Sequence, residues 1–258
     1  MEIWQAIVLG AVQGLTEFLP VSSSGHLILL QNWFGITEGV IFFSLMLHLG
    51  TLVPVIIVLW KEILATLKRP YNKFLYWVVA SIPAGIVGII FSVAFDLDEL
   101  FANNIWLLAI TFTLTAIELI FAERRAKKIA LDNGINLKTS LMMGVGQACG
   151  VLPGLSRSGT TVTFGTIAKV NSVDNANFSF LMSIPIIVAA VALELLKGAK
   201  NGFGGIDFVP LAFGMATAMI TGYVAIKFML KIIKKANFKW FSLYLILMAT
   251  ATLVTALI

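Results

Sequence analysis

Residues 10–26 read Gly-Ala-Val-Gln-Gly-Leu-Thr-Glu-Phe-Leu-Pro-Val-Ser-Ser-Ser-Gly-His, which places a carboxylate, three hydroxyls and an imidazole inside an apolar segment. Pro20 and Gly25 bracket the hydroxyls. Because proline removes a backbone donor and glycine weakens a helix, one continuous helix is not expected there. A second stretch of this kind, residues 147–161, contains Val-Leu-Pro-Gly-Leu-Ser-Arg-Ser-Gly-Thr-Thr at 151–161. Together they predict two broken helices that carry polar groups within a hydrophobic chain.

The composition indicates an integral membrane protein. Of the 258 residues, 59% are hydrophobic and 12% are charged, and the mean hydropathy is +0.96. Soluble domains carry about 25% charged residues. The length suits a single membrane domain that spans residues 1–258.

Six apolar stretches are long enough to cross a bilayer as helices, for which roughly 20 residues are needed. They are residues 40–60, 74–95, 105–122, 178–196, 208–230 and 240–258. Two further stretches, 3–34 and 140–170, are apolar but interrupted, and each half is too short to cross. We expect re-entrant helical hairpins there, which are tolerated where protein or a polar cavity covers the exposed backbone. The predicted fold class is all-α, a polytopic membrane protein with six transmembrane helices and two re-entrant hairpins.

The basic residues predict the orientation. With six spans, fifteen of the eighteen lysines and arginines fall on one side, in segments 61–73, 123–139 and 227–239 and at Lys169. By the positive-inside rule that side is cytoplasmic, and both termini are extracytoplasmic. The net charge of +5 therefore marks topology and contact with anionic lipid headgroups. No nucleic-acid partner is predicted.

The sequence contains an internal repeat in which residues 134 positions apart are identical. The identical positions are polar residues and glycines, which two merely hydrophobic segments would not share by chance. The matched pairs are Gln13 with Gln147, Ser22 with Ser156, Ser24 with Ser158, and Gly25 with Gly159. Three spans separate the copies, so the second copy (about 140–258) should be inverted relative to the first (about 3–122). In such inverted repeats the broken helices are expected to meet near the membrane midplane.

Arg157 is the basic residue that lies outside the loops and helix ends. An intramembrane arginine should have a partner or a ligand, and its guanidinium suits phosphate because it donates two parallel hydrogen bonds. Nearby hydroxyls and helix N-termini also favour an anion. The candidate substrate-binding residues are Gln13, Ser22, Ser24, Ser156, Ser158 and Thr161. The alternative is that Arg157 only pairs with Glu17 to hold the hairpins together.

Glu17, Ser23 and His26 are the candidate catalytic residues in the first interrupted stretch. Glu17 could act as a general base, or coordinate a divalent cation beside phosphate oxygens. His26 could activate a serine hydroxyl or a water. Ser23 is the best candidate nucleophile, since the repeat aligns it with Arg157. His48, which lies in the middle of a predicted span, is interpreted as structural.

Gly14–His26 and Pro153–Gly159 together closely resemble the undecaprenyl-diphosphatase family of bacteria, the bacitracin-resistance membrane phosphatases. The resemblance extends over nearly the whole chain. It implies hydrolysis of undecaprenyl diphosphate to undecaprenyl phosphate and inorganic phosphate in the bacterial inner membrane, which recycles the lipid carrier for cell-wall synthesis and confers bacitracin resistance. It also implies an active site open to the extracytoplasmic face, with Glu17, Ser23, His26 and Arg157 central, and help from a divalent cation, Mg²⁺ or Ca²⁺.

This chain departs from many family members, which carry glutamate where it has Gln13, so a metal held by two carboxylates at that turn is not expected. Phosphatidic-acid phosphatases use superficially similar Ser-Gly-His and Ser-Arg motifs. However, both histidines here precede Arg157, so the later nucleophilic histidine of that family is missing.

The sequence leaves three points open: the nucleophile, the choice between enzyme and transporter, and the oligomeric state. In one mechanism Ser23 attacks the terminal phosphorus, and in the other Glu17 and His26 activate a water that attacks it. Broken helices in inverted repeats are also a transporter design, so a flippase of a polyprenyl phosphate or a carrier of another anion is the alternative to the enzyme. A homodimer is a further expectation.

Overall fold

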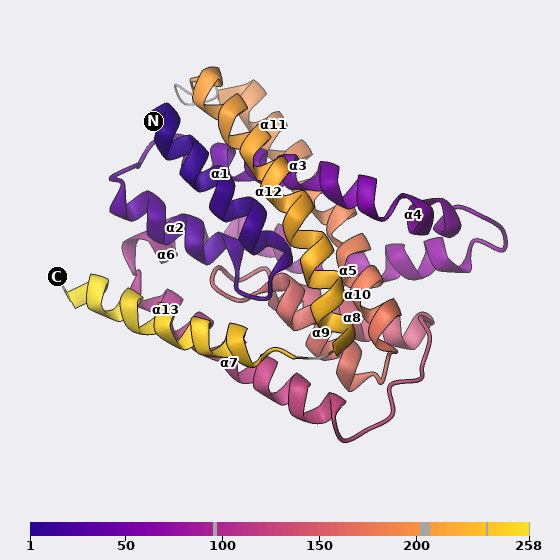
Figure 1. Ribbon diagram of the computed structural model, residues 1–258. Coiled ribbons are helices and arrows are strands. Elements are labelled where there is room, and N and C mark those ends of the chain that lie inside the picture. Colours follow the sequence, from indigo (N-terminus) through magenta and orange to yellow (C-terminus); the bar gives the residue numbers. More distant parts are fainter. Residues whose placement is uncertain (95–96, 202–206, 236, 258) are drawn as a thin grey trace.

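The computed structural model describes residues 1–94, 97–201, 207–235 and 237–257, and within these ranges the chain is built from helices (Figure 1). The helices are α1 (Ile3–Phe18), α2 (Ser23–Trp33), α3 (Val40–Val58), α4 (Trp60–Thr66), α5 (Asn72–Ala94), α6 (Leu97–Asn103), α7 (Trp106–Ala126), α8 (Leu137–Cys149), α9 (Arg157–Ile167), α10 (Ser172–Leu181), α11 (Ser183–Asn201), α12 (Phe208–Lys235) and α13 (Lys239–Leu257). The predicted all-α class is confirmed.

Six segments of the described chain are long and apolar enough to cross a membrane, as predicted. Five are α3, α5, α7, α12 and α13, and the sixth, Ser172–Lys200, consists of α10 followed by α11. Large apolar side chains on their outer faces are uncovered: Ile89 on α5 is 62% exposed and Ile220 on α12 is 63% exposed. Such side chains suit contact with lipid tails, so the chain is a multi-pass membrane protein.

The sixth segment differs from the single helix predicted over 178–196. It breaks after Leu181, four residues before Pro185. A proline ring clashes with the carbonyl of the residue four positions earlier, which ends a helix there. The Ser183 hydroxyl donates to the carbonyl of Phe180 at the break, at 2.7 Å.

The two interrupted stretches each form a pair of short helices, α1 with α2 and α8 with α9. Ser22 and Ser156 are the N-caps of α2 and α9, and their hydroxyls accept hydrogen bonds from the backbone N–H groups of Gly25 and Gly159. The loops that join the helices of each pair lie close together inside the molecule (Figure 1). The Ser158 hydroxyl donates across them to the carbonyl of Leu19, at 3.0 Å.

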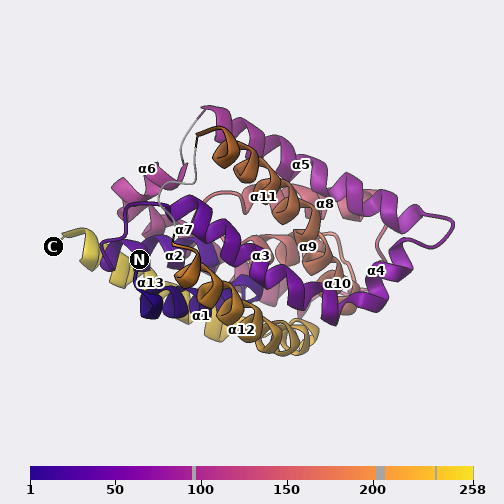
Figure 2. The same cartoon turned by 90° about the horizontal axis from the view of Figure 1, so that it is seen from above.

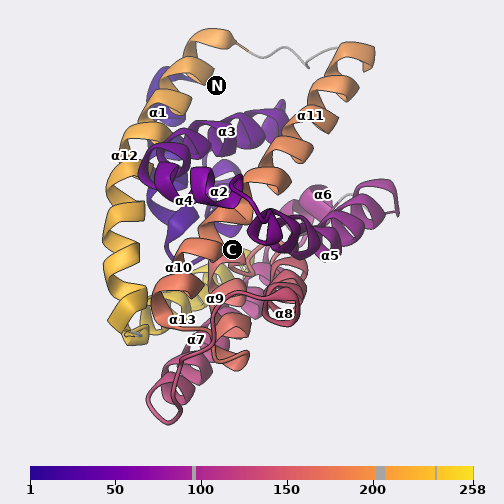
Figure 3. The ribbon, with the colours of Figure 1, turned by 90° about the vertical axis from the view of Figure 1, so that its right-hand side faces the viewer.

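Helices from distant parts of the sequence surround these pairs. Seen from above, α3 lies between α11 and α12 and packs against both (Figure 2). In Figure 3, α12 runs along one flank of the bundle and α5 along the other. α1 packs against α12 and α8 packs against α5, so each pair of short helices is held by one of these flanking helices.

Candidate active site

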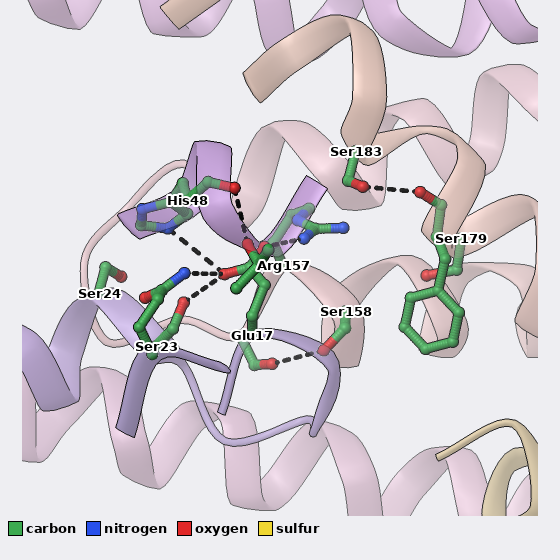
Figure 4. A network of polar contacts seen from close by, with 12 residues as sticks. Glu17, Ser23, Ser24, His48, Arg157, Ser158, Ser179 and Ser183 are labelled. Atoms are coloured by element: carbon green, nitrogen blue, oxygen red, sulfur yellow. Dashed lines mark hydrogen bonds and ion pairs between the residues drawn. The ribbon is translucent and has the colours of Figure 1, made fainter. Parts of the chain in front are cut away.

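Glu17, in the last turn of α1, is the centre of a buried polar cluster (Figure 4). Its side chain is only 4% exposed. Its Oε2 accepts hydrogen bonds from the Ser23 hydroxyl at 2.6 Å and from Nε2 of Gln13 at 3.0 Å. Its Oε1 accepts a hydrogen bond from Nη2 of Arg157. A carboxylate this deeply buried is stabilised only when charge and donors surround it in this way.

Arg157 reaches Glu17 from the first residue of α9, across 140 residues of sequence. The ion pair and the bond from Ser158 to Leu19 are two polar contacts that join the tips of the two helix pairs. Nη1 of Arg157 is buried and has no hydrogen-bond partner in the described part of the chain, and the same holds for Oε1 of Gln13. The guanidinium therefore holds the carboxylate through Nη2, and its Nη1 is left without a partner in the described part of the chain.

A pair of serines lies at the start of each of the two helices, the N-cap residue and the residue two positions later. Ser22 and Ser24 lie 3.3 Å apart through their hydroxyls at the start of α2, and Ser156 and Ser158 lie 3.2 Å apart at the start of α9. In each pair one serine is an N-cap whose hydroxyl accepts from a glycine N–H. Ser22 also has a φ of +67°, a left-handed conformation that is strained for a residue with a side chain.

His26 and Thr161, two of the predicted site residues, make their hydrogen bonds elsewhere. Nδ1 of His26 lies 2.7 Å from the carbonyl of Ser22, and Nε2 lies 2.7 Å from the hydroxyl of Tyr244 on α13. The Thr161 hydroxyl bonds the carbonyl of Arg157 at 2.9 Å and the hydroxyl of Ser179 at 2.5 Å. Neither side chain bonds Glu17 or Ser23 in this conformation, and their predicted roles stay predictions.

From the sequence, His48 was interpreted as structural. In the structure it lies in the polar cluster around Glu17. Its Nε2 is 3.3 Å from Oε2 of Glu17, and its side chain is 20% exposed. Figure 4 shows the His48 ring pointing at Glu17 beside Ser23. The sequence does place an ionisable group, His48, in the middle of an apolar span. Burying such a group in the membrane is costly, so its presence indicates a partner.

A cavity of about 750 Å³ leads to this cluster. Ser24 and His48 line it next to the cluster, and Glu194 and Lys197 of α11 also line it. The Lys197 ammonium lies 3.8 Å from the Glu194 carboxylate. The cavity has the size of a typical small-molecule site, and its lining includes both His48 at the cluster and the end of α11.

In the described part of the chain the cluster offers a metal ion a single carboxylate, that of Glu17. Both oxygens of Glu17 are engaged, and a guanidinium beside the carboxylate opposes a second cation. Within the described ranges no group of three or more histidine, cysteine, aspartate or glutamate side chains could hold a metal. The expectation that Glu17 coordinates a cation therefore finds no such group in the described ranges, although the unpartnered Oε1 of Gln13 is a further oxygen in the cluster, and it stays a prediction.

The family model and the curated relatives that match this chain all align with nearly its full length. The family model described as bacitracin resistance protein BacA matches residues 6–251. The chain is 40% identical over 257 residues to the undecaprenyl-diphosphatase of Carboxydothermus hydrogenoformans, which covers 98% of this chain and 97% of that protein. It is 38% identical over 267 residues to the undecaprenyl-diphosphatase of Methanobrevibacter smithii (95% and 94% covered) and 39% identical over 259 residues to that of Moorella thermoacetica (96% and 96% covered).

Proposed function

The chain belongs to the family of the bacitracin resistance protein BacA, and from that premise we propose that it is a membrane hydrolase of undecaprenyl diphosphate. The products are undecaprenyl phosphate and inorganic phosphate, so the reaction recycles the lipid carrier of cell-wall synthesis and confers bacitracin resistance. The observation that carries the proposal is the contact of Arg157 and Ser23 with one buried carboxylate, Glu17. A nucleophile, a base and a phosphate-binding cation are thereby combined in one cluster.

In the proposed mechanism Ser23 is the nucleophile. Its hydroxyl already donates to Glu17 at 2.6 Å, within the range from which a general base removes a proton. As the Ser23 oxygen attacks the terminal phosphorus, Glu17 takes the proton and the bond to the prenyl phosphate breaks. A water then attacks the phosphoserine and releases inorganic phosphate.

The charge that develops on the phosphoryl oxygens is stabilised by Arg157 and by two helix N-termini. The unpartnered Nη1 of Arg157 provides a donor that costs no existing hydrogen bond in the described chain. The N-termini of α2 and α9 meet at the same place, and their backbone dipoles favour an anion. Preorganised donors of this kind usually make the largest contribution to catalysis of phosphoryl transfer.

A divalent cation, Mg²⁺ or Ca²⁺, would reach this site bound to the diphosphate of the substrate, because the protein's own donors offer a single carboxylate. When bound, it neutralises phosphate charge. The chain's residues supply the nucleophile, the base and the guanidinium independently of it.

We also propose that the two helix pairs are re-entrant hairpins of an inverted repeat, within one membrane domain. A shift of 134 residues carries the first residues of α1 and α2, Ile3 and Ser23, onto the first residues of α8 and α9, Leu137 and Arg157. The same shift relates two close packings. Gly10 of α1 lies against the backbone of Gly214 in α12, and Gly144 of α8 lies against the backbone of Ala80 in α5.

The positive-inside rule then orients the protein in the bacterial inner membrane. The basic segments, residues 61–73, 123–139 and 227–239, face the cytoplasm. Both termini, together with Lys197 and Glu194 at the cavity, lie on the extracytoplasmic side. The diphosphate enters the cavity from that side while the prenyl chain stays among the apolar helix faces.

Phosphate release from a purified prenyl diphosphate tests the function. The protein is assayed in detergent, where no membrane gradient exists, beside Arg157→Ala and the control Lys127→Ala on the exposed end of α7. We expect release by the wild type and the control and loss of at least about 100-fold in Arg157→Ala, as for removal of one stabilising donor. Binding of the substrate without release would instead support a carrier.

A further inference from the structure

The hydrogen bond of His48 to a backbone carbonyl shows which ring nitrogen carries a hydrogen. Its Nδ1 lies 2.8 Å from the carbonyl oxygen of Ser44. A carbonyl oxygen can only accept, so Nδ1 carries a hydrogen and donates it. The other ring nitrogen, Nε2, is then the atom whose proton can come and go, and it is the atom that faces Oε2 of Glu17 at 3.3 Å.

His26 provides an internal comparison, because its Nδ1 is held by a carbonyl in the same way. Its Nε2, however, meets the hydroxyl of Tyr244 at 2.7 Å, and that hydroxyl can donate to the neutral ring. Nε2 of His48 meets a carboxylate oxygen instead. Two lone pairs would repel each other there, so the His48–Glu17 contact is stabilised when one proton lies between the two atoms.

His48 also reaches the space where a substrate would lie. His48 lines the cavity of about 750 Å³, as do Ser24 and Ser44. Glu17, by contrast, is 4% exposed and is enclosed by Ser23, Gln13 and Arg157. Among the groups that touch Glu17 in the described chain, His48 is the one that lines the cavity.

We propose that His48 is a catalytic residue, the general acid that protonates the departing prenyl phosphate. This inference rests on the proposed phosphatase function. In the step, the Ser23 oxygen bonds to the terminal phosphorus, and the bond from that phosphorus to the bridging oxygen breaks with its electron pair on the bridging oxygen. The Ser23 proton passes to Oε2 of Glu17, and the proton on Nε2 of His48 passes to the bridging oxygen. The Glu17–His48 pair holds one proton before and after the step.

The charged groups that the described chain places at His48 or in the lining of its cavity come from four helices. Glu17 of α1 faces it directly, with Arg157 of α9 behind that carboxylate. Across the cavity lie Glu99 of α6 and the Glu194–Lys197 pair of α11. Glu17 is paired with Arg157 and Glu194 with Lys197.

The test compares His48→Gln with the wild type over a range of pH, using phosphate release from a prenyl diphosphate in detergent. Glutamine keeps an N–H donor for Glu17 but has no proton to give. We expect kcat to fall about 100- to 10,000-fold, as for loss of a general acid, with KM changed less than about threefold. The wild-type kcat should fall at high pH as the ring loses its proton, and this alkaline limb should be absent in His48→Gln.

A second variant covers the case in which His48→Gln does not fold. His48→Ala opens space on the cavity side, so added imidazole should restore part of the activity, with greater rescue at the lower pH values where imidazole is protonated. Lys127→Ala, whose side chain is 65% exposed and lies outside the cavity, is the control and should keep wild-type rates without response to imidazole.

Three results would overturn the assignment while leaving the phosphatase function intact: a kcat of His48→Gln within threefold of wild type, an unchanged alkaline limb, or no rescue of folded His48→Ala by imidazole. Absence of phosphate release by the wild type would remove the proposed function itself, and the role of His48 with it.

Discussion

Replacement of the two charged residues that join the helix tips, alone and together, should show how strongly they are coupled. The perturbations are Glu17→Gln, Arg157→Gln and the double variant. In Arg157→Gln a carboxylate that is 4% exposed loses its guanidinium partner, and Ser23, Gln13 and His48 remain around it. Removal of one partner from a buried pair costs about 3–5 kcal/mol, because the remaining charge is uncompensated. In the double variant no such charge remains.

The assay is thermal unfolding in detergent at one fixed heating rate. For a chain of this size about 1 kcal/mol corresponds to roughly 2–4 °C, so each single variant should unfold roughly 6–20 °C below the wild type. The double variant should lose less than the sum of the two, by about 2 kcal/mol or more, since groups in one network couple by up to about 3 kcal/mol. The control Lys127→Gln removes an ammonium that is 65% exposed and should cost about 1 kcal/mol or less. Additive effects within about 0.5 kcal/mol would refute the argument that the two tips are held by a buried ion pair.

Three further predictions concern packing and hydrogen bonds. Gly10→Ala places a methyl group 2.2 Å from the carbonyl oxygen of Gly214 and should destabilise the protein by about 1–3 kcal/mol, whereas Gly85→Ala, which meets nothing within 4 Å, should be neutral or stabilising in the same unfolding assay. Tyr244→Phe removes the donor to buried His26 and should cost about 1–3 kcal/mol, while kcat of the folded protein should stay near wild type; a large fall in kcat at unchanged stability would place His26 in the chemistry instead. Ser158→Ala removes the bond to the carbonyl of Leu19 and should lower stability by about 1 kcal/mol, and no change would show that this contact between the tips is dispensable.

The spans and the broken helices could be predicted because they depend on local properties of the chain. Apolar length determines which segments can cross a bilayer, and Pro20 and Pro153 mark the breaks that the structure has between α1 and α2 and between α8 and α9. The contact between Glu17 and Arg157 was also predictable, since a charge in an apolar segment requires an opposite charge.

The partners of the two histidines could not be predicted, because they depend on where each side chain points in the folded protein. His26 follows Ser-Ser-Ser-Gly in the sequence, yet its ring turns to Tyr244, 218 residues away. His48 lies 31 residues from Glu17 in the sequence, and only the crossing of α3 over the end of α1 brings its Nε2 to that carboxylate. A motif in the sequence records neighbours along the chain, whereas the partner of an imidazole is decided by the packing of several helices.

The most direct measurement is the capture of a phosphorylated enzyme by rapid quenching after mixing with a prenyl diphosphate labelled in its terminal phosphate. The account predicts label on Ser23 in the wild type and none in Ser23→Ala or Glu17→Gln, with phosphate release reduced in both variants. Full phosphate release by Ser23→Ala would contradict it, because the hydroxyl bonded to Glu17 would then not be the group that attacks.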